Sequence, residues 1–182
     1  MNTITAKEKY LKTVATQMKK EFSYSSVMEV PRIKKVVVNV GIGKMIKDGD
    51  KIEEVVSSLQ TITGQKPVKT KARKAIAGFK IREGQEVGVK VTLRGARMWQ
   101  FIDRLVTATL PRTRDFQGIS KKSVDSKGNI NIGIKEHTIF PEISPEKVRH
   151  TFGLQVTIST TAISQAEGLA LFKLLGFPLK SE

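Results

Sequence analysis

The chain has 182 residues, a length that fits one domain, and its 32 Lys and Arg against 17 Asp and Glu give a net charge of +15. A field of this sign attracts polyanions, of which nucleic acid is the first candidate and an anionic membrane the second. The chain contains no cysteine, which excludes disulfides, thiolate catalysis and cysteine-rich zinc sites.

The N-terminal part of the sequence predicts a helix followed by a strand. Thr5 and Glu8 have the spacing of a capping box, which predicts a helix from this point to about Phe22. After Pro31, the segment IKKVVVNVGIG alternates in the manner of a half-buried strand. We expect one side to carry Val36, Val38 and Val40, and the other side to carry Lys35, Val37 and Asn39.

A second helix and a basic segment come next. Asp50 and Glu53 repeat the cap spacing, and apolar residues at helical spacing continue to Gly64, where we expect the helix to end. The segment GQKPVKTKARKAIAGFKIREGQ then holds seven Lys or Arg and no acid between Gly64 and Arg82. We interpret residues 71–86 as a protruding basic loop.

The second half of the sequence continues with strands and helices. VGVKVTLRG, NINIGIKE and FGLQVTISTTA alternate apolar and polar residues, and each predicts a strand. The helix after the first of these ends at Pro111, and PRTRDFQGISKKSVDSKG forms a second basic loop. Ser144 followed by Pro145 predicts a short helix, and Ser164 caps a last helix that ends near Gly176.

These elements together predict an α+β fold. Strands with one apolar and one polar side indicate an antiparallel or mixed sheet of about five strands, with helices packed on one face and the other face open. No repeat or linker divides the sequence, so we expect residues 1–182 to form a single RNA-binding domain from which the long basic loop protrudes.

The open face of this sheet is predicted to be polar and basic. Its residues are amides, hydroxyls and cations, without a carboxylate or an aromatic ring: Lys35, Asn39, Lys90, Thr92, Arg94, Asn129, Asn131, Lys135, Gln155, Thr157 and Ser159. A solvated face is the simpler interpretation, but the charge of the chain favours RNA. Sheets that bind single-stranded RNA stack bases on aromatic side chains, so a face without them fits structured RNA.

The basic loop also admits two interpretations. Irregular loops of this length are uncommon unless they are functional or disordered. The first interpretation is therefore a flexible loop without a binding partner. However, the apolar residues Ile76 and Phe79 lie among its cations, and a loop that contacts only solvent does not explain these two residues. A loop that binds nucleic acid uses both kinds of residue, because cations contact phosphates while apolar atoms contact sugars or bases. We favour this second interpretation.

Catalysis and metal binding find no support in the sequence. GIGK at 41–44 lacks the spacing and the Ser or Thr of a phosphate-binding loop, and His137 and His150 have no metal-ligand pattern around them. We therefore expect no enzyme activity, no cofactor and no metal. The alternative in this class is an enzyme that holds phosphate-bearing substrates with Lys44 and Arg94.

Membrane association is a further alternative that the sequence disfavours. The cations lie on strands and loops instead of along one amphipathic helix. The sequence has neither a signal-peptide pattern nor an apolar run long enough to span a bilayer, so we expect a cytoplasmic protein.

Six segments, which cover essentially the whole chain in order, carry a family resemblance. They are VPRIKKVVVNVGIGK, TGQKPVKTKARKAIAGFKIREG, VTLRGARMWQFIDRL, LPRTRDFQGIS, GNINIGIKEHTIFPEI and the TTA before the last helix. They resemble the bacterial large-subunit ribosomal protein L5 family. The resemblance implies a ribosome-bound protein that binds 5S rRNA and helps attach it to the large rRNA in the central protuberance. It also implies contacts with the P-site tRNA and with neighbouring ribosomal proteins, one of them in the small-subunit head.

The resemblance also assigns roles to residues. In the family, an Asn, a Gln and a Thr form the core of 5S rRNA recognition, and these fall on Asn39, Gln65 and Thr92. To these the polar face adds Lys35, Lys90 and Arg94. The loop that faces tRNA, residues 71–84, contains Lys71, Arg73, Lys74, Ile76, Phe79, Lys80 and Arg82. Arg112 and Arg114 are the candidates for the intersubunit contact.

Overall fold

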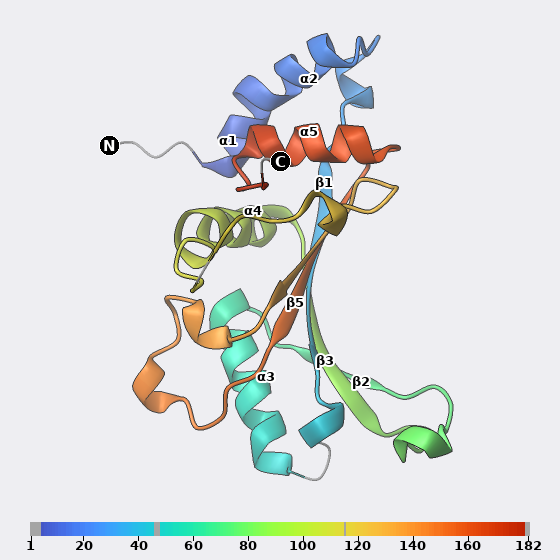
Figure 1. The fold of residues 1–182 in the computed structure, drawn as a ribbon, viewed down its shortest axis with the longest axis vertical. Helices are drawn as coiled ribbons and strands as arrows, with labels where there is room; N and C mark the ends of the chain where they lie inside the picture. The colour runs from blue at the N-terminus through green and yellow to red at the C-terminus, as the bar shows by residue number, and fades with distance from the viewer. Residues whose placement is uncertain (1–4, 46–47, 115, 181–182) are drawn as a thin grey trace. The chain divides into compact units, whose positions relative to one another are not determined.

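The computed structural model describes residues 5–45, 48–114 and 116–180. The chain forms two compact units. Unit 1 comprises Met1–Val36, Leu93–Ile132 and Thr157–Glu182, and unit 2 comprises Val37–Thr92 and Gly133–Val156. One antiparallel sheet has the strand order β2-β3-β1-β5-β4, which confirms the predicted α+β class. Figure 1 shows the helices and strands of the chain.

The strands are β1 (Ile33–Gly41), β2 (Val68–Lys71), β3 (Glu86–Leu93), β4 (Ile130–Ile134) and β5 (Leu154–Thr160). Strand β2 was not predicted, because VKTK has no apolar alternation and none of its residues is buried. It pairs antiparallel with β3, with Val68 opposite Lys90 and Lys71 opposite Glu86. A bulge between Thr70 and Lys71 shifts the register. The segment predicted as a loop, residues 71–86, therefore starts at the end of β2, ends at the start of β3 and is part of a β-hairpin.

The helices match the prediction closely. The first consists of α1 (Ala6–Lys9), a π-helical turn (Tyr10–Val14) and α2 (Ala15–Glu21). The others are α3 (Gly49–Thr63), α4 (Gly95–Arg104), which continues as a π-helical turn (Leu105–Thr109), and α5 (Gln165–Leu175). The helix predicted at Pro145 is a short 3₁₀ turn, Pro145–Lys147. Within the described ranges, no helix is both long enough and apolar enough to cross a bilayer.

Two of the predicted N-terminal caps, Thr5 and Ser164, lie in unit 1. The Thr5 hydroxyl accepts a hydrogen bond from the Glu8 N–H at 3.4 Å, and the Ser164 hydroxyl accepts one from the Glu167 N–H at 3.3 Å. Buried side chains of the helices and strands form its core: Val14, Met18, Val36, Met98, Phe101, Ile102, Leu105, Ile130, Ile132, Ile158, Leu171, Phe172 and Leu175. Among them, Val36 on β1 was predicted to face inward.

Unit 2 is built around α3. The helix ends as predicted at Gly64, which adopts a left-handed φ of +66°. Its start differs from the prediction, because the residue that precedes the helix is Asp48 and not Asp50. The Asp48 carboxylate binds the Lys51 ammonium at 2.7 Å. The core consists of the buried residues Val38, Val40, Ile52, Val55, Leu59, Ile62, Val89, Val91, Leu154 and Val156. The outward side of the same strands is thus left without a helical cover.

Candidate nucleic-acid interface

Alternation along the strands of unit 2 leaves one polar side. Val89 and Val91 are buried on β3, while Lys90 between them is exposed and Thr92 is half-buried. Asn39 is exposed on β1. We call this outward side the polar face of unit 2, defined by Asn39, Lys90, Thr92, Lys135 and Gln155. The exposure of Asn39, Lys90 and Gln155 agrees with the predicted alternation, whereas Lys135 lies in a bend directly after the end of β4 (Ile130–Ile134).

Gln65 reaches strand β3 from the end of α3. Its side-chain Nε2 donates a hydrogen bond to the carbonyl oxygen of Thr92 at 3.4 Å. Behind it, the buried Thr63 hydroxyl donates to the carbonyl oxygen of Leu59 at 2.6 Å and accepts from the Gln65 N–H at 3.4 Å. These bonds fix the helix end on β3, so two of the three residues assigned to 5S rRNA recognition lie in contact.

Thr70 and Gly88 complete the face. Gly88 alternates with the apolar residues of its strand as the sequence predicts, but Thr70 was not predicted as part of the face. A Cβ added to Gly88 would lie 2.7 Å from the Thr70 hydroxyl, 3.3 Å from the Val40 carbonyl oxygen and 3.8 Å from Asn39 Oδ1. The side chains of Thr70 and Asn39 therefore approach one another over the glycine. The signal available in the sequence was the pair of β-branched residues at 68 and 70, which favours a strand.

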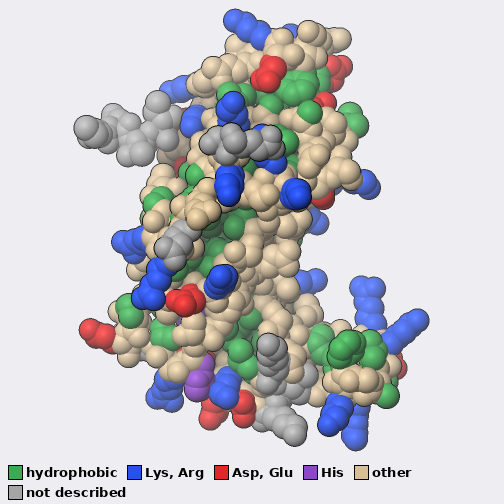
Figure 2. Space-filling model, in the orientation of Figure 1, with side chains coloured by type: hydrophobic (Ala, Val, Ile, Leu, Met, Phe, Trp, Pro, Cys, Tyr) green, Lys and Arg blue, Asp and Glu red, His purple; other side chains and the backbone are tan. Residues whose placement is uncertain are grey.

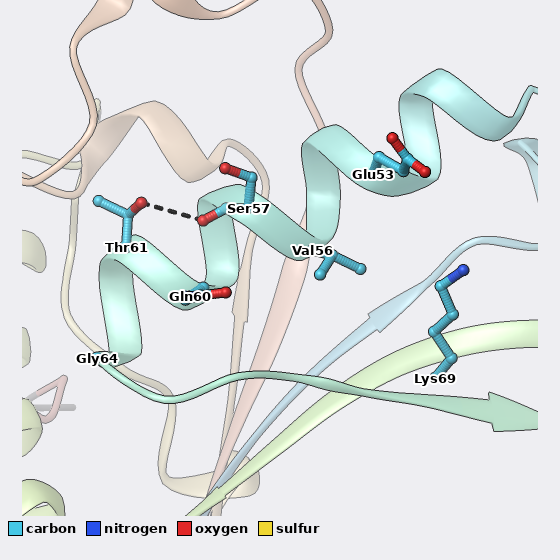
Figure 3. Close-up of a pocket in the computed structure, with 7 residues that line it drawn as sticks. All are labelled: Glu53, Val56, Ser57, Gln60, Thr61, Gly64 and Lys69. Carbon is cyan, nitrogen blue, oxygen red and sulfur yellow. Dashed lines mark hydrogen bonds between the residues drawn. The ribbon is translucent and has the colours of Figure 1, made fainter.

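The one carboxylate on these two paired strands points away from the polar face. The bulge sets Glu86 opposite Lys71, and the Glu86 carboxylate pairs with the Lys69 ammonium at 3.0 Å. Lys69 lies opposite the buried Val89 and lines a pocket of about 650 Å³ with side chains of α3 (Figure 3). The pair thus belongs to the helix side of the sheet.

The Asn39 side chain makes no hydrogen bond to a described residue. In contrast, Asn129 and Asn131 of unit 1 are bonded within the chain. In unit 1, Thr157 donates to Asn131 Oδ1 at 2.7 Å, and Asn129 Oδ1 accepts from the Ser159 hydroxyl at 3.3 Å. Lys35 and Arg94 also lie in unit 1, half-buried on β1 and exposed before α4 respectively.

The basic segment is an ordered hairpin. Beyond β2 and β3, Ala72 N–H donates to Gln85 O at 2.8 Å, and an isolated bridge joins Ile76 to Ile81. A 3₁₀ turn, Ala77–Phe79, forms the tip. Its ladder hydrogen bonds replace the irregular loop that the sequence predicted.

The hairpin presents cations around an apolar tip. All seven candidate residues are exposed: Lys71, Arg73, Lys74, Ile76, Phe79, Lys80 and Arg82. The Phe79 side chain is 75% exposed and that of Ile76 is 48% exposed, so neither serves the core. Figure 2 shows Lys and Arg side chains projecting around hydrophobic ones over this hairpin. The arrangement suits a partner with both phosphates and apolar surfaces.

Comparison with known proteins decides the family. Residues 26–82 match the family described as Ribosomal protein L5, and residues 86–179 match the family described as the C-terminus of the same ribosomal protein. The large ribosomal subunit protein uL5 of Colwellia psychrerythraea (strain 34H) is 49% identical over 173 residues, which cover 95% of this chain and 96% of that protein. The chain belongs to the ribosomal protein L5 family. It is therefore a ribosomal protein, as the resemblance implied.

The candidate residues of unit 2 fall inside the ranges that match the L5 family. Asn39, Gln65 and the hairpin tip lie in the first range, and Lys90 and Thr92 lie in the second. The remaining candidates belong to unit 1. Arg112 and Arg114 are exposed in the turn that follows Leu105–Thr109, where Arg112 N–H donates to Thr109 O at 3.2 Å.

The described residues offer no observation that supports the enzyme alternative. The Lys44 side chain lies outside the described atoms. In the described parts of the chain, no three His, Cys, Asp or Glu side chains are placed to hold a metal ion. The pocket of Figure 3 joins Glu53 and Lys69 to hydroxyls and an amide, and it contains none of the predicted site residues.

His137 belongs to the core, which the sequence pattern did not indicate. Its ring is 0% exposed and stacks on Phe152 at a centroid distance of 3.9 Å. Its Nδ1 accepts a hydrogen bond from the Phe152 N–H at 3.5 Å. Burial lowers the pKa of His137, against the opposing effect of the Glu54 carboxylate. Burial thus favours the neutral imidazole, which packs against Phe152.

Proposed function

We propose that this protein is a structural constituent of the large ribosomal subunit that binds 5S rRNA through the polar face of unit 2. The observation that carries the proposal is the set of outward amide, hydroxyl and ammonium groups on β1 and β3, formed by Asn39, Thr92 and Lys90. It is supported by membership of the L5 family, since the relative in Colwellia is a large-subunit protein by its name.

The chemistry of the face favours folded RNA as the ligand. The Asn39 amide has both donors and an acceptor available, the Thr92 side chain offers a hydroxyl, and Lys90 supplies a cation. Such groups match the 2′-hydroxyls and phosphates that a folded RNA displays. No aromatic ring lies among the defining residues of the face, so base stacking on it plays no part. Lys35 and Arg94 of unit 1 are further cations for the same RNA.

The hairpin and the turn at Arg112 supply the other proposed contacts. We assign the P-site tRNA to the hairpin, because its exposed cations and its apolar tip suit a nucleic acid groove. Arg112 and Arg114 are the proposed contact to a protein of the small-subunit head. Through 5S rRNA, the protein helps attach that RNA to the large rRNA in the central protuberance.

A binding assay with purified protein and 5S rRNA tests the central part of this proposal. We expect an affinity that falls steeply as salt rises, because each neutralised phosphate releases counterions. Asn39→Ala and Thr92→Val leave the net charge unchanged, and we expect them to weaken binding more than Lys74→Gln or Lys80→Gln in the hairpin. Ser57→Ala, on the exposed side of α3, is the matched control. Equal losses from the face and the hairpin would contradict the division of roles.

A further inference from the structure

A groove runs between the outer side of α3 and strand β2 in unit 2 (Figure 3). Its volume is about 650 Å³, with Lys69 lining it from β2. The residues that line it from the helix and its C-cap are Glu53, Val56, Ser57, Gln60, Thr61 and Gly64. We call it the α3–β2 groove. The helix rises about 16 Å from Glu53 to Gly64, which is the length of about five residues in an extended segment.

The exposed surface of α3 differs from that of the other described α-helices, because it carries no Lys or Arg. Each of the others exposes at least one cation: Lys7 on α1, Lys20 on α2, Arg97 on α4 and Lys173 on α5. The exposed residues of α3 are Gly49, Asp50, Glu53, Ser57, Gln60 and Thr61. Lys51 of the same helix is half-buried and bound by the Asp48 carboxylate at 2.7 Å. This surface therefore offers little to the phosphates of a nucleic acid.

The charged groups of the groove leave one carboxylate without a partner. The Lys69 ammonium is paired with the Glu86 carboxylate at 3.0 Å. No described residue forms an ion pair or a hydrogen bond with the exposed Glu53 carboxylate. The helix dipole explains an acid in the first turn, such as Asp50, but its effect falls off within that turn and does not explain Glu53. The groove thus combines a free carboxylate with neutral hydroxyl, amide and methyl groups.

Strand β2 adds an open sheet edge to this groove. It is the outermost strand and pairs only with β3, so its other edge has no strand partner among the described residues. Lysines often protect such edges from pairing, but Lys69 is engaged by Glu86, and Val68 beside it is 61% exposed. An extended segment can bind an open edge as an added strand, with alternate side chains directed to adjacent pockets.

We propose that the α3–β2 groove binds an extended basic segment of a neighbouring ribosomal protein. A Lys or Arg of the segment pairs with Glu53, its backbone lies along the edge of β2, and small or apolar side chains pack on Val56. A ribosomal protein fits this chemistry, because proteins that bind RNA carry an excess of Lys and Arg, as this chain does with its net charge of +15.

This surface is separate from those of the proposed function. Lys69 lies opposite the buried Val89, so the groove is on the helix side of the sheet and not on the polar face. Arg112 and Arg114, the proposed contact to the small-subunit head, belong to unit 1. The groove therefore adds a binding partner and does not depend on the binding of 5S rRNA.

A peptide array provides the first test. The purified full chain is applied to overlapping short peptides that cover the sequences of the other large-subunit proteins. We expect it to bind a peptide rich in Lys or Arg, although the chain itself is cationic. Glu53→Gln should bind that peptide about three- to tenfold more weakly, because one charge-assisted contact is lost, and Glu53→Lys should not bind it. Glu21→Gln, which removes an exposed carboxylate from α2, is the matched control and should bind as the parent does.

Cross-linking in assembled large subunits provides the second test. The chain has no cysteine, so a benzophenone attached to Gln60→Cys reports on the groove alone. Light should link position 60 to the segment that the array identifies. Gln17→Cys, exposed on α2 in unit 1, is the control and should not be linked to that segment.

The proposal is overturned if no peptide binds, or if Glu53→Gln and the parent bind the peptides equally. It is also overturned if position 60 is linked to rRNA, to a second copy of this chain or to nothing in the assembled subunit. A folded Glu53→Gln variant that loses 5S rRNA would assign the groove to RNA instead. The proposed function fails by a different result, the failure of the parent chain to bind 5S rRNA.

Discussion

Gln65 Nε2 donates a hydrogen bond to the carbonyl oxygen of Thr92 at 3.4 Å, which joins the residue after the α3 C-cap to strand β3. The bond uses the backbone of Thr92 and leaves its hydroxyl available to a ligand. Gln65 thus has a structural role beside its proposed role in RNA recognition, whereas the Thr92 hydroxyl has only the latter. The two roles are separable by mutation.

Thr92→Val and Gln65→Ala should therefore differ. Thr92→Val keeps the carbonyl that Gln65 binds, so we expect an unchanged free energy of unfolding and an affinity for 5S rRNA lowered by about 1 kcal/mol, the value of one hydrogen bond. Gln65→Ala should lower both the affinity and the free energy of unfolding, the latter by about 0.5–1.5 kcal/mol. Urea denaturation and filter binding measure the two effects. A Thr92→Val variant that loses stability and keeps its affinity would contradict this assignment.

A side chain at Gly88 should destabilise unit 2. Because a Cβ there would meet the Thr70 hydroxyl at 2.7 Å, Gly88→Ala should lower the free energy of unfolding by about 1–3 kcal/mol. In a Thr70→Ala background the same change should cost less, because the closest remaining atom is the Val40 carbonyl oxygen at 3.3 Å. A double-mutant cycle in urea measures the coupling between the two positions. Additive effects would mean that Thr70 does not pack over Gly88.

The hairpin cations should matter for tRNA and little for stability or 5S rRNA. Arg73, Lys74, Lys80 and Arg82 are exposed, so changing all four to Gln should leave the free energy of unfolding close to that of the parent. The salt slope of 5S rRNA binding should be preserved. Large subunits that carry the variant should bind P-site tRNA more weakly in a filter assay. A variant that loses 5S rRNA and keeps tRNA would reverse the assignment of the two surfaces.

Acid should destabilise unit 2 through His137. Burial holds the pKa of this imidazole below its usual value of about 6.5, so at slightly acidic pH the unfolded chain binds a proton that the folded chain does not. The resulting stability is present above the unfolded pKa and is lost as pH falls below about 6.5 towards the folded pKa. Urea denaturation from pH 7.5 to 5.5 measures this slope. The slope of the free energy of unfolding against pH should be smaller in His137→Phe. The His150→Gln variant, which removes an exposed imidazole, measures how much the other histidine contributes to this slope.

Much of the fold followed from local patterns in the sequence. The alternation in β1, the caps at Thr5 and Ser164 and the glycine that ends α3 are set by neighbouring residues, and each was predicted. The polar face of unit 2 followed as well, because its outward side chains alternate with buried valines on β1 and β3.

The features that the sequence did not predict depend on contacts between distant segments. Strand β2 forms because its backbone pairs with β3, and an edge strand with exposed side chains carries no apolar alternation. The approach of Thr70 to Gly88 follows from that pairing. His137 is buried by its stacking on Phe152, fifteen positions away. The hairpin order likewise comes from cross-strand bonds and not from local propensity.

Directed cleavage of 5S rRNA from single introduced cysteines tests the central claim most directly. The chain has no cysteine of its own, so an iron chelate tethered to Lys90→Cys on the polar face, or to Ser57→Cys on α3, marks one site only. With the RNA saturated by protein, we predict strong cleavage of 5S rRNA from position 90 and none from position 57. Cleavage from position 57 without cleavage from position 90 would contradict the claim that the polar face of unit 2 binds this RNA.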